Sequence, residues 1–286
     1  MKFIIVDSPG EMLMQAQTYL AQHEATNNLP LGLLIRLAKE EQTGCLASGV
    51  CKPFLAIAKN DTESVSFFII QTPPYNYIIS GEVEQIPEVV NWLVQCQRTI
   101  PGVTGEKELV KAFSSEWKKR TEQHGQVFMR QRIYRLDQVI TIPRRKGRLH
   151  LAKKQDIPLV TNWILGFHKE ALTPTTKKEA QDFAITSIEN KTIYLWKNEH
   201  GRPVSMAKRA RGTEKGVAVS AVYTPDEYKR RGYATTCVAT LSERLLDEGF
   251  HFCCLYTDID NPTSNRIYTR IGYRPVADSL DYRFKI

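Results

Sequence analysis

The sequence predicts an α/β protein of two similar halves, each with a central mixed β-sheet flanked by helices. The main observation is that short β-branched segments alternate with longer segments whose apolar residues recur every three to four positions. The second half has the order β-α-α-β-β-β-α-β-α-β. The first half has α-α-β-β-β-α, a short unassigned stretch and α-β, which is the same order without its first strand. The second observation is length, because 286 residues correspond to two domains of ordinary size.

This repetition suggests a first domain over residues 1–140, a basic linker over 141–147 and a second domain over 148–286. The two halves share no visible sequence identity, so an unrelated α/β domain is the alternative for the first half.

In the first half, amphipathic periodicity predicts helices over residues 9–24, 31–41, 86–98 and 107–122. Strands are expected over 53–59, 65–71, 75–80 and 127–136. Asn60-Asp61 and Pro73-Pro74 separate the three consecutive strands.

In the second half, strands are expected over 148–153, 192–197, 203–210, 217–223 and 250–257. Asp156 is placed to cap a helix that has Pro158 in its first turn, and further helices are expected over 176–190, 234–248 and 266–271. Residues 273–286 are expected to close the chain as strands around Pro275 and Asp281.

Composition indicates a soluble, cytoplasmic protein without a membrane partner, since 42% of the residues are hydrophobic and 24% are charged. The first residues are too short an apolar run for a signal peptide, and no run approaches a membrane span. The six histidines show no metal-ligand spacing, so we expect no metal. The cysteines form no Cys-x-x-Cys pair, which indicates free thiols in a reducing compartment: Cys45, Cys51, Cys96, Cys237, Cys253 and Cys254.

Half of the net charge of +8 comes from residues 139–149, which contain four basic residues and no acid: Arg144, Arg145, Lys146 and Arg148. No aromatic residue lies among them. We interpret this segment as a solvated hinge first, a contact with an anionic ligand second and a nucleic-acid contact third, and therefore expect no nucleic-acid partner.

Residues 222–236 are the most informative stretch. A strand leads into the basic sequence Lys229-Arg230-Arg231-Gly232, and a helix follows. The first turn of a helix leaves backbone N–H groups without partners, and these donors suit a phosphate or pyrophosphate. Gly232 has no Cβ, so the backbone can approach a ligand closely. A solvated loop before an ordinary helix is the alternative.

A second stretch follows the next strand. It contains Asn261, Ser264, Tyr268, Gly272 and Tyr273 on and around a short helix. Together the two stretches resemble the GNAT superfamily of acyl-CoA-dependent N-acetyltransferases over about residues 147–286. The family's first motif is Gln/Arg-x-x-Gly-x-Gly/Ala, which Lys229 to Ala234 match with lysine in the first position. Its second motif is an Asn, a small residue, a Tyr and Gly-Phe/Tyr.

The resemblance implies an N-acetyltransferase that moves an acetyl group from acetyl-CoA to an amine by direct attack in a ternary complex. The acceptor amine and the oligomeric state are not identified by the sequence. The residues implied to contact acetyl-CoA are the strand backbone at Val222, Tyr223 and Thr224, the pyrophosphate turn at Arg230, Arg231, Gly232, Tyr233, Ala234 and Thr235, and Asn261.

The catalytic candidates are Tyr268, Glu170 and Asp258. By resemblance, Tyr268 points at the sulfur of CoA and protonates the departing thiolate; core packing is its alternative role. Many relatives have a glutamate base on the strand before the phosphate turn, but residues 216–221 contain no carboxylate. Glu170, Glu227 and Asp258 are the candidates nearby, and a water chain to solvent can replace a single base.

The first half has an acidic sequence where the phosphate turn would follow Ile79. Residues 80–87 contain Glu82 and Glu84 and no base, so they would repel a pyrophosphate. We therefore expect a degenerate GNAT-like domain without a cofactor site. Two other functions remain open for the whole chain: an acyl-CoA-binding regulatory module without catalysis, and an aminoacyl or other acyl transferase on a doubled GNAT scaffold.

Overall fold

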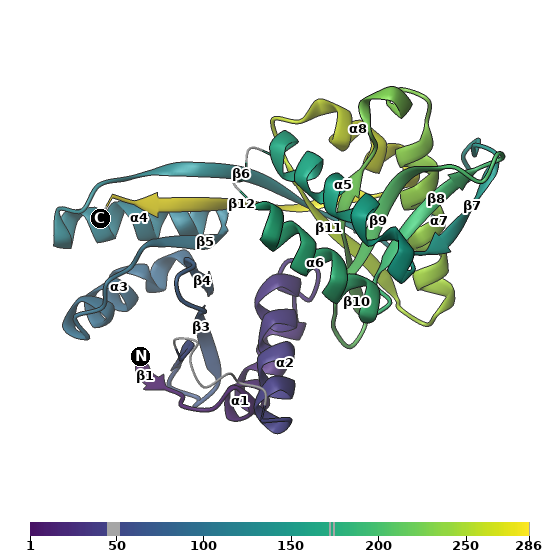
Figure 1. The fold of residues 1–286 in the computed structure, drawn as a ribbon. Coiled ribbons are helices and arrows are strands. Elements are labelled where there is room, and N and C mark those ends of the chain that lie inside the picture. The colour runs from purple at the N-terminus through teal and green to yellow at the C-terminus, as the bar shows by residue number, and fades with distance from the viewer. Residues whose placement is uncertain (45–51, 172, 174, 286) are drawn as a thin grey trace. The chain divides into compact units, whose positions relative to one another are not determined.

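The chain forms two compact units that do not follow a single cut in the sequence. The computed structural model describes residues 1–44, 52–171, 173 and 175–285, so Cys45 and Cys51 lie outside the described residues. The first unit comprises Met1–Ile133, Tyr256–Asn261 and Pro275–Ile286, and the second comprises Tyr134–Leu255 and Pro262–Arg274. The predicted fold class is confirmed, because each unit is a mixed sheet with helices on both faces (Figure 1).

The first unit has the strand order β1-β2-β3-β4-β5-β12-β6. Strands β1 to β4 pair antiparallel, β4 and β5 pair parallel, and β5 and β12 pair antiparallel. The strands are β1 (Lys2–Ile5), β2 (Phe54–Lys59), β3 (Val65–Gln71), β4 (Tyr77–Ser80), β5 (Gly102–Glu106), β6 (Gly125–Leu136) and β12 (Arg274–Phe284). The helices are α1 (Pro9–Ala21), α2 (Asn28–Gln42), α3 (Ile86–Gln95) and α4 (Lys107–Thr121).

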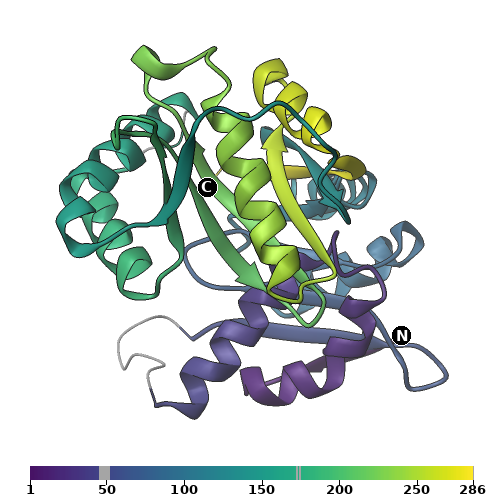
Figure 2. The ribbon, with the colours of Figure 1, turned by 90° about the vertical axis from the view of Figure 1, so that its right-hand side faces the viewer.

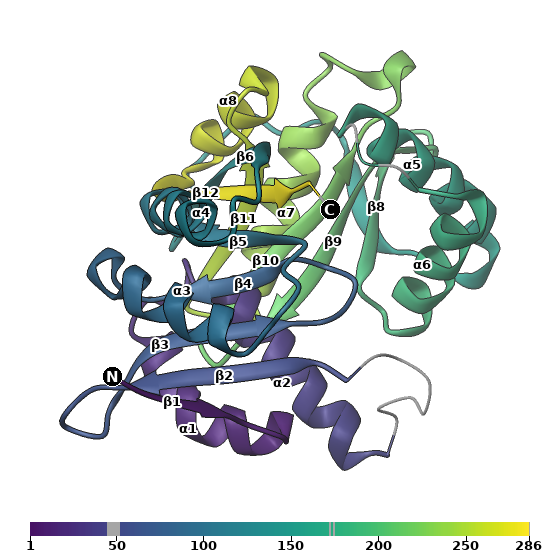
Figure 3. The same cartoon turned by 90° about the vertical axis from the view of Figure 1, so that its left-hand side faces the viewer.

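Two apolar layers hold this unit together, one on each face of its sheet. Met12 and Leu34 of α1 and α2 pack against Phe68 on one face. On the other face, Val90 and Phe113 of α3 and α4 belong to a second cluster. Figure 3 shows α1 and α2 on one side of β2 to β5, and α3 and α4 on the other. Successive side chains of β2 and β3 point to opposite faces of the sheet and so contribute to both layers. For this reason both strands are buried almost throughout.

The structure adds two strands that the sequence analysis did not assign. Strand β1 is only four residues long, which is too short for a clear pattern. Strand β5 contains Gly102 and Gly105, which are typical of turns. Here the glycines are required by close packing: a Cβ on Gly102 would collide with the carbonyl oxygen of Tyr282, and one on Gly105 would lie 2.7 Å from the carbonyl oxygen of Ile79.

The last strand of the chain belongs to the first unit. We expected several strands around Pro275 and Asp281, but residues from Arg274 to Phe284 form the single strand β12. Pro275 is its second residue, where the lack of an N–H is tolerated. Ser279 to Arg283 pair with β5, and Leu280 and Phe284 join the same cluster as Phe113. The core of the first unit is therefore completed by residues more than 150 positions away in the chain.

The second unit has the strand order β11-β10-β9-β8-β7, in which only β10 and β11 pair parallel. Its strands are β7 (Gly147–Leu151), β8 (Ile193–Asn198), β9 (Pro203–Gly212), β10 (Gly216–Tyr223) and β11 (Phe252–Asp258), of which the last three residues of β11 belong to the first unit. Its helices are α5 (Ile157–Glu170), α6 (Lys177–Glu189), α7 (Tyr233–Asp247) and α8 (Pro262–Ile271).

Helices cover both faces of this sheet as well. Val238 and Leu241 of α7 pack with Val217 in one cluster. Ile164 of α5 and Ala184 of α6 lie in another cluster on the opposite face. Figure 2 shows α7 lying along the strands, with α5 and α6 beyond them. Among the described residues, no helix combines the length and the apolar character needed to cross a bilayer.

The C-terminal strand gives a stability prediction. Leu280 is 3% exposed in the first core, so Leu280→Ala should lower the free energy of unfolding by about 2–5 kcal/mol through the cavity it leaves. Val276, on the same strand, is 43% exposed, and Val276→Ala should change it by about 0.5 kcal/mol or less. Urea unfolding followed by tryptophan fluorescence measures both. Equal effects of the two substitutions would mean that β12 does not belong to the core.

A half-buried lysine on β9 gives a pH prediction. Lys208 donates to Ser187 Oγ at 2.9 Å and lies 4.2 Å from the centre of the Phe183 ring. Burial, with a smaller contribution from Arg211, lowers the pKa of Lys208 from 10.5 to about 8. Below pH 8 the ammonium is charged in both states, so folding carries the full cost of burying it. Between pH 8 and 10.5 the unfolded chain alone keeps the proton, so this cost falls and stability rises with pH.

We therefore expect Lys208→Met to be more stable than the wild type at pH 7, with a difference that shrinks as the pH rises from 8 to 10.5. Urea unfolding at pH 7, 9 and 10 measures it. The exposed Lys178 on α6 supplies the control, because Lys178→Met buries no new group and removes no buried charge. A Lys208→Met variant less stable than the wild type at pH 7 would mean that the bond to Ser187 outweighs the cost of burying the ammonium.

Candidate functional site

The candidate site begins where β10 leaves its neighbours. The pairing of β10 with β11 covers only Gly216–Ala218, so the last five residues of β10 extend past it. On the other side, the register with β9 shifts between Ser220 and Tyr223, and Ala221 has a φ of 47°. A β-bulge of this kind turns the backbone and interrupts the hydrogen-bond ladder. The end of β10 therefore presents backbone groups that a ligand can use.

The turn after β10 has a backbone built for close approach. Arg230 and Gly232 both have left-handed conformations, with φ of 61° and 80°. Left-handed residues close together curve the chain so that successive N–H groups point into one concavity, which suits an anion. The conformation is expected for glycine and is unusual for arginine. The glycine that the sequence singled out thus meets both requirements of the site, conformation and space.

The N-terminus of α7 has free donors. Gly232 is its N-cap, and no side chain caps the helix. The N–H groups of Tyr233, Ala234 and Thr235 are among the first N–H groups of a helix, which have no partner within it. Thr236 is the first residue to bond back, with its N–H and its Oγ1 both donating to the Gly232 carbonyl at 3.1 and 3.0 Å. These donors and the positive end of the helix dipole together favour a phosphate group.

Charged side chains around the turn fall into two groups. Lys229 pairs with Glu170 and Asp226, each at 2.6 Å. Burial lowers the pKa of Lys229, but hydrogen bonds to Asp226 and Glu170 outweigh it and raise the pKa above 10.5. In contrast, Arg230 and Arg231 are exposed and make no ion pair with any described residue. The lysine holds the turn in place, and the two arginines remain available for an anion.

Two of the residues expected to contact the cofactor through the backbone have their side chains packed inside the unit. The Tyr223 ring lies 6.3 Å from Trp163, and its hydroxyl contacts Gly166, where a Cβ would collide with it. Thr224 Oγ1 lies 2.9 Å from Ser205 Oγ, which also donates to the Tyr223 carbonyl at 3.1 Å. A carbonyl oxygen can accept a second bond, so Tyr223 can still serve a ligand through its backbone.

The two candidate bases lie in different units and are both held by local contacts. Glu170, in the second unit, is the carboxylate that pairs with Lys229. Asp258, in the first unit, accepts from the Asp260 N–H at 2.9 Å through Oδ1, and its carbonyl accepts from the Asn261 N–H at 3.2 Å. Each therefore has a structural role in a turn, and their catalytic roles stay predictions, as does the cofactor contact of Asn261.

Tyr268 is buried on α8 among aromatic side chains. Its ring lies 6.2 Å from Tyr134 and 5.9 Å from Tyr273, and the residue is 7% exposed. Burial raises the pKa of the Tyr268 phenol far above its usual value of 10. A phenol in this environment stays protonated at any physiological pH, so it can donate a hydrogen bond but gives up its proton reluctantly.

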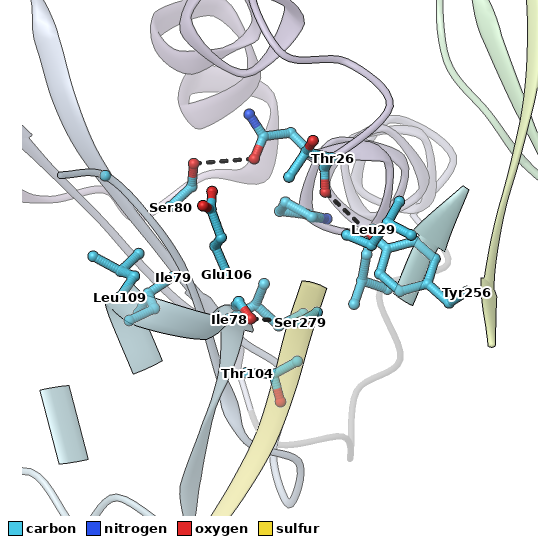
Figure 4. Close-up of a pocket in the computed structure, with 15 residues that line it drawn as sticks. Thr26, Leu29, Ile78, Ile79, Ser80, Thr104, Glu106, Leu109, Tyr256 and Ser279 are labelled. Atoms are coloured by element: carbon cyan, nitrogen blue, oxygen red, sulfur yellow. Dashed lines mark hydrogen bonds between the residues drawn. The ribbon is translucent and has the colours of Figure 1, made fainter. Parts of the chain in front are cut away.

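The first unit has its own cavity at the corresponding place in its sheet, where β4 and β5 diverge after two pairs (Figure 4). Its polar side chains bond to one another: Ser80 Oγ donates to Asn27 Oδ1 at 3.0 Å, and the Tyr256 hydroxyl donates to the Thr26 carbonyl at 2.9 Å. The volume of about 50 Å³ suits a few water molecules. This cavity is too small for a pantetheine chain.

The turn at the end of β4 differs from the one at the end of β10. Glu82 and Gln85 cap each other's backbone, and the Glu82 N–H donates to Gln85 Oε1 at 3.0 Å. Pro87 removes one donor from the first turn of α3. Gly81 faces the Phe67 ring, which a Cβ would strike. These contacts occupy the donors that a phosphate would need. They support our prediction that the first half has no cofactor site, which stays a prediction.

Two features of the site were not predicted from the sequence. The bulge at Ala221 has no signal in the sequence, because alanine is not typical of a positive φ. Arg145, which we assigned to a hinge, lies beside the turn: a Cβ on Gly232 would be 3.2 Å from Arg145 Nε. The four basic residues of its segment were the available signal, and contact with an anionic ligand was the second interpretation.

Comparisons with known proteins agree with this architecture. The family described as "FR47-like protein" matches residues 200–281. An acetyltransferase of the GNAT family from Colwellia psychrerythraea has a TM-score of 0.61 at 10% identity and covers 100% of both chains. A GCN5-related N-acetyltransferase from Sphaerobacter thermophilus has a TM-score of 0.63 at 13% identity, covering 99% of this chain and 95% of its own.

A tandem GNAT protein from the clavulanic acid biosynthesis pathway has a TM-score of 0.56 at 10% identity and covers 99% of this chain and 98% of its own. No curated protein matches the sequence. The structural likeness extends over both halves, and the family match includes the turn before α7. The chain therefore has a tandem GNAT fold, with a match to the FR47-like family in its second half.

Proposed function

We propose that this protein is an N-acetyltransferase, which binds acetyl-CoA at the turn before α7 and transfers the acetyl group to an amine. The observation that carries the proposal is the uncapped N-terminus of α7 behind Gly232, with Arg230 and Arg231 unpaired among the described residues. This arrangement offers backbone donors, a helix dipole and two cations to a pyrophosphate. The likeness of the fold to GNAT acetyltransferases also supports the proposal.

In the proposed reaction, the acceptor nitrogen attacks the thioester carbonyl carbon, a C–N bond forms, and the C–S bond breaks to release CoA. An alkyl ammonium has a pKa of ~10.4, so removing its proton near pH 7.4 costs ~4 kcal/mol. Glu170 is neutralised by Lys229 and Asp258 caps a turn. We therefore favour transfer of this proton through water to solvent, with neither carboxylate as a dedicated base.

Tyr268 is our proposed acid for the departing sulfur. The raised pKa of Tyr268 keeps its phenol protonated. The structure shows no hydrogen bond from the Tyr268 hydroxyl to any described residue. Donation of a hydrogen bond to a thiolate stabilises the leaving group without full proton transfer. The same burial also favours the second candidate function, an acyl-CoA-binding regulatory module, because a reluctant acid and a paired Glu170 suit binding without turnover.

Cofactor binding is tested at Gly232. Gly232→Asp adds a carboxylate and a side chain where the phosphate would lie, so the full chain should lose detectable affinity for CoA in isothermal titration calorimetry. Gly201→Asp is the matched control: Gly201 also has a positive φ, of 73°, in the hairpin between β8 and β9, and an added Cβ meets nothing within 4 Å. Unchanged CoA affinity in Gly232→Asp would refute the assignment of the turn.

Catalysis is tested at Tyr268. Tyr268→Phe should lower kcat about ten- to a hundredfold while leaving the Kd for acetyl-CoA nearly unchanged, because one proton donor is lost and the packing remains. Thiol release with a panel of amines measures kcat. Tyr273→Phe is the control, since it removes a buried hydroxyl that bonds Ser242 Oγ at 2.8 Å in the same cluster.

If Tyr268→Phe keeps full kcat, the tyrosine only packs. If Tyr268→Phe and Tyr273→Phe lower kcat equally, the effect comes from the cluster and not from an acid. If the wild type binds acetyl-CoA and acetylates no amine in the panel, the regulatory module replaces the enzyme.

A further inference from the structure

The basic segment before β7 is fixed to α7. The Arg145 N–H donates to Thr236 Oγ1 at 3.1 Å, and Thr236 is 1% exposed. Arg144 forms a two-pronged ion pair with Glu243, with distances of 2.7 and 3.0 Å. In Figure 2 the teal segment that leads into β7 crosses the N-terminal end of α7. Residues 144 and 145 are therefore part of the second unit's surface at the candidate site, which does not fit a free hinge.

Thr236 connects this segment to the turn. Its Oγ1 donates to the Gly232 carbonyl and accepts from the Arg145 N–H. A single buried hydroxyl therefore sets the position of both backbones. As a result the Arg145 side chain lies over Gly232, with Nε 3.2 Å and Nη2 3.9 Å from the place of a Cβ. A guanidinium at this distance reaches any anion bound on the exposed face of the glycine.

The arginines along α7 differ in their partners. Arg144 is neutralised by Glu243, and Arg244 by Glu248 at 2.9 Å. The Arg145 side chain has no carboxylate partner among the described residues, as is also true of Arg230 and Arg231. Three cations without partners thus surround the N-terminus of α7, two from the turn itself and one from the segment before β7.

Arg145 also lines an open cavity of about 450 Å³ beside α7, together with Arg148 and Trp196. The cavity therefore combines cationic side chains with room beside α7, both of which suit a phosphate-bearing ligand.

We propose that Arg145 is a further binding residue for the acyl donor, contacting one of its phosphate groups beside Gly232. This inference rests on the proposed function, because it assumes that CoA binds at the turn. CoA offers two sources of the same chemistry, the pyrophosphate at the turn and the 3′-phosphate on the ribose. The planar guanidinium of Arg145 can form two parallel bonds to either.

The test compares Arg145→Gln with Lys146→Gln in the full chain by isothermal titration calorimetry. Both remove one positive charge from neighbouring residues, but Lys146 is 87% exposed and has only a 4.0 Å contact with Glu199. We expect Arg145→Gln to weaken CoA binding about ten- to a hundredfold, the effect of a lost charge-assisted bond. Lys146→Gln should weaken it less than about threefold, because an exposed charge is screened. Arg145→Lys should recover part of the loss.

Three ligands identify the phosphate. If Arg145 contacts the 3′-phosphate, dephospho-CoA should bind wild type and Arg145→Gln equally. If it contacts the pyrophosphate, the loss should persist with dephospho-CoA and disappear with pantetheine, which has no phosphate. Equal weakening by Arg145→Gln and Lys146→Gln, or a loss that persists with pantetheine, would overturn the inference and leave the proposed function standing. A wild type that binds no CoA would overturn both.

Discussion

The pairing of β12 with β5 is the interaction on which the first unit depends. Five residue pairs hold the end of the chain in a sheet formed by its first half, and Leu280 and Phe284 complete the core beneath it. This contact joins residues that are far apart in the sequence, so it can form only after the intervening chain has been synthesised, and its formation carries the entropic cost of closing that long loop. The first unit therefore needs the second half to be synthesised, although most of its residues come from the first.

Local patterns were enough to predict most elements but not their assembly. Amphipathic stripes gave α4 within one residue at its C-terminal end, and the β-branched run gave β3 as observed. Strand β5 was not predicted because its glycines are required by close packing against residues that are distant in the sequence, such as Tyr282. The turn at Gly232 was readable because its conformation is local. The place of Arg145 was not, because it depends on Thr236, 91 residues away.

The chemistry of the second unit follows from which charges are already paired. Lys229 stabilises the turn by bonding Glu170 and Asp226, and this same pairing removes Glu170, one of the candidate carboxylates, from consideration as a base. Exposed ion pairs contribute little to stability, about 0–1 kcal/mol, so their main effect here is positional. They leave the arginines at the N-terminus of α7 as the uncompensated charges, and an anionic ligand is the partner that compensates them.

The two turns that follow β4 and β10 show how one backbone plan can gain or lose a phosphate site. After β10, Gly232 faces outward in a left-handed conformation and the helix start has no side-chain cap. After β4, Gly81 faces the Phe67 ring, and Glu82 and Gln85 satisfy each other's backbone. Capping stabilises a helical turn by about 1 kcal/mol. After β4 this gain falls to the short 3₁₀ turn Val83–Gln85 that leads into α3, because α3 itself, like α7, has no side-chain cap. An uncapped helix N-terminus surrounded by cations lowers the stability of the free protein, and the binding of an anion would restore that stability.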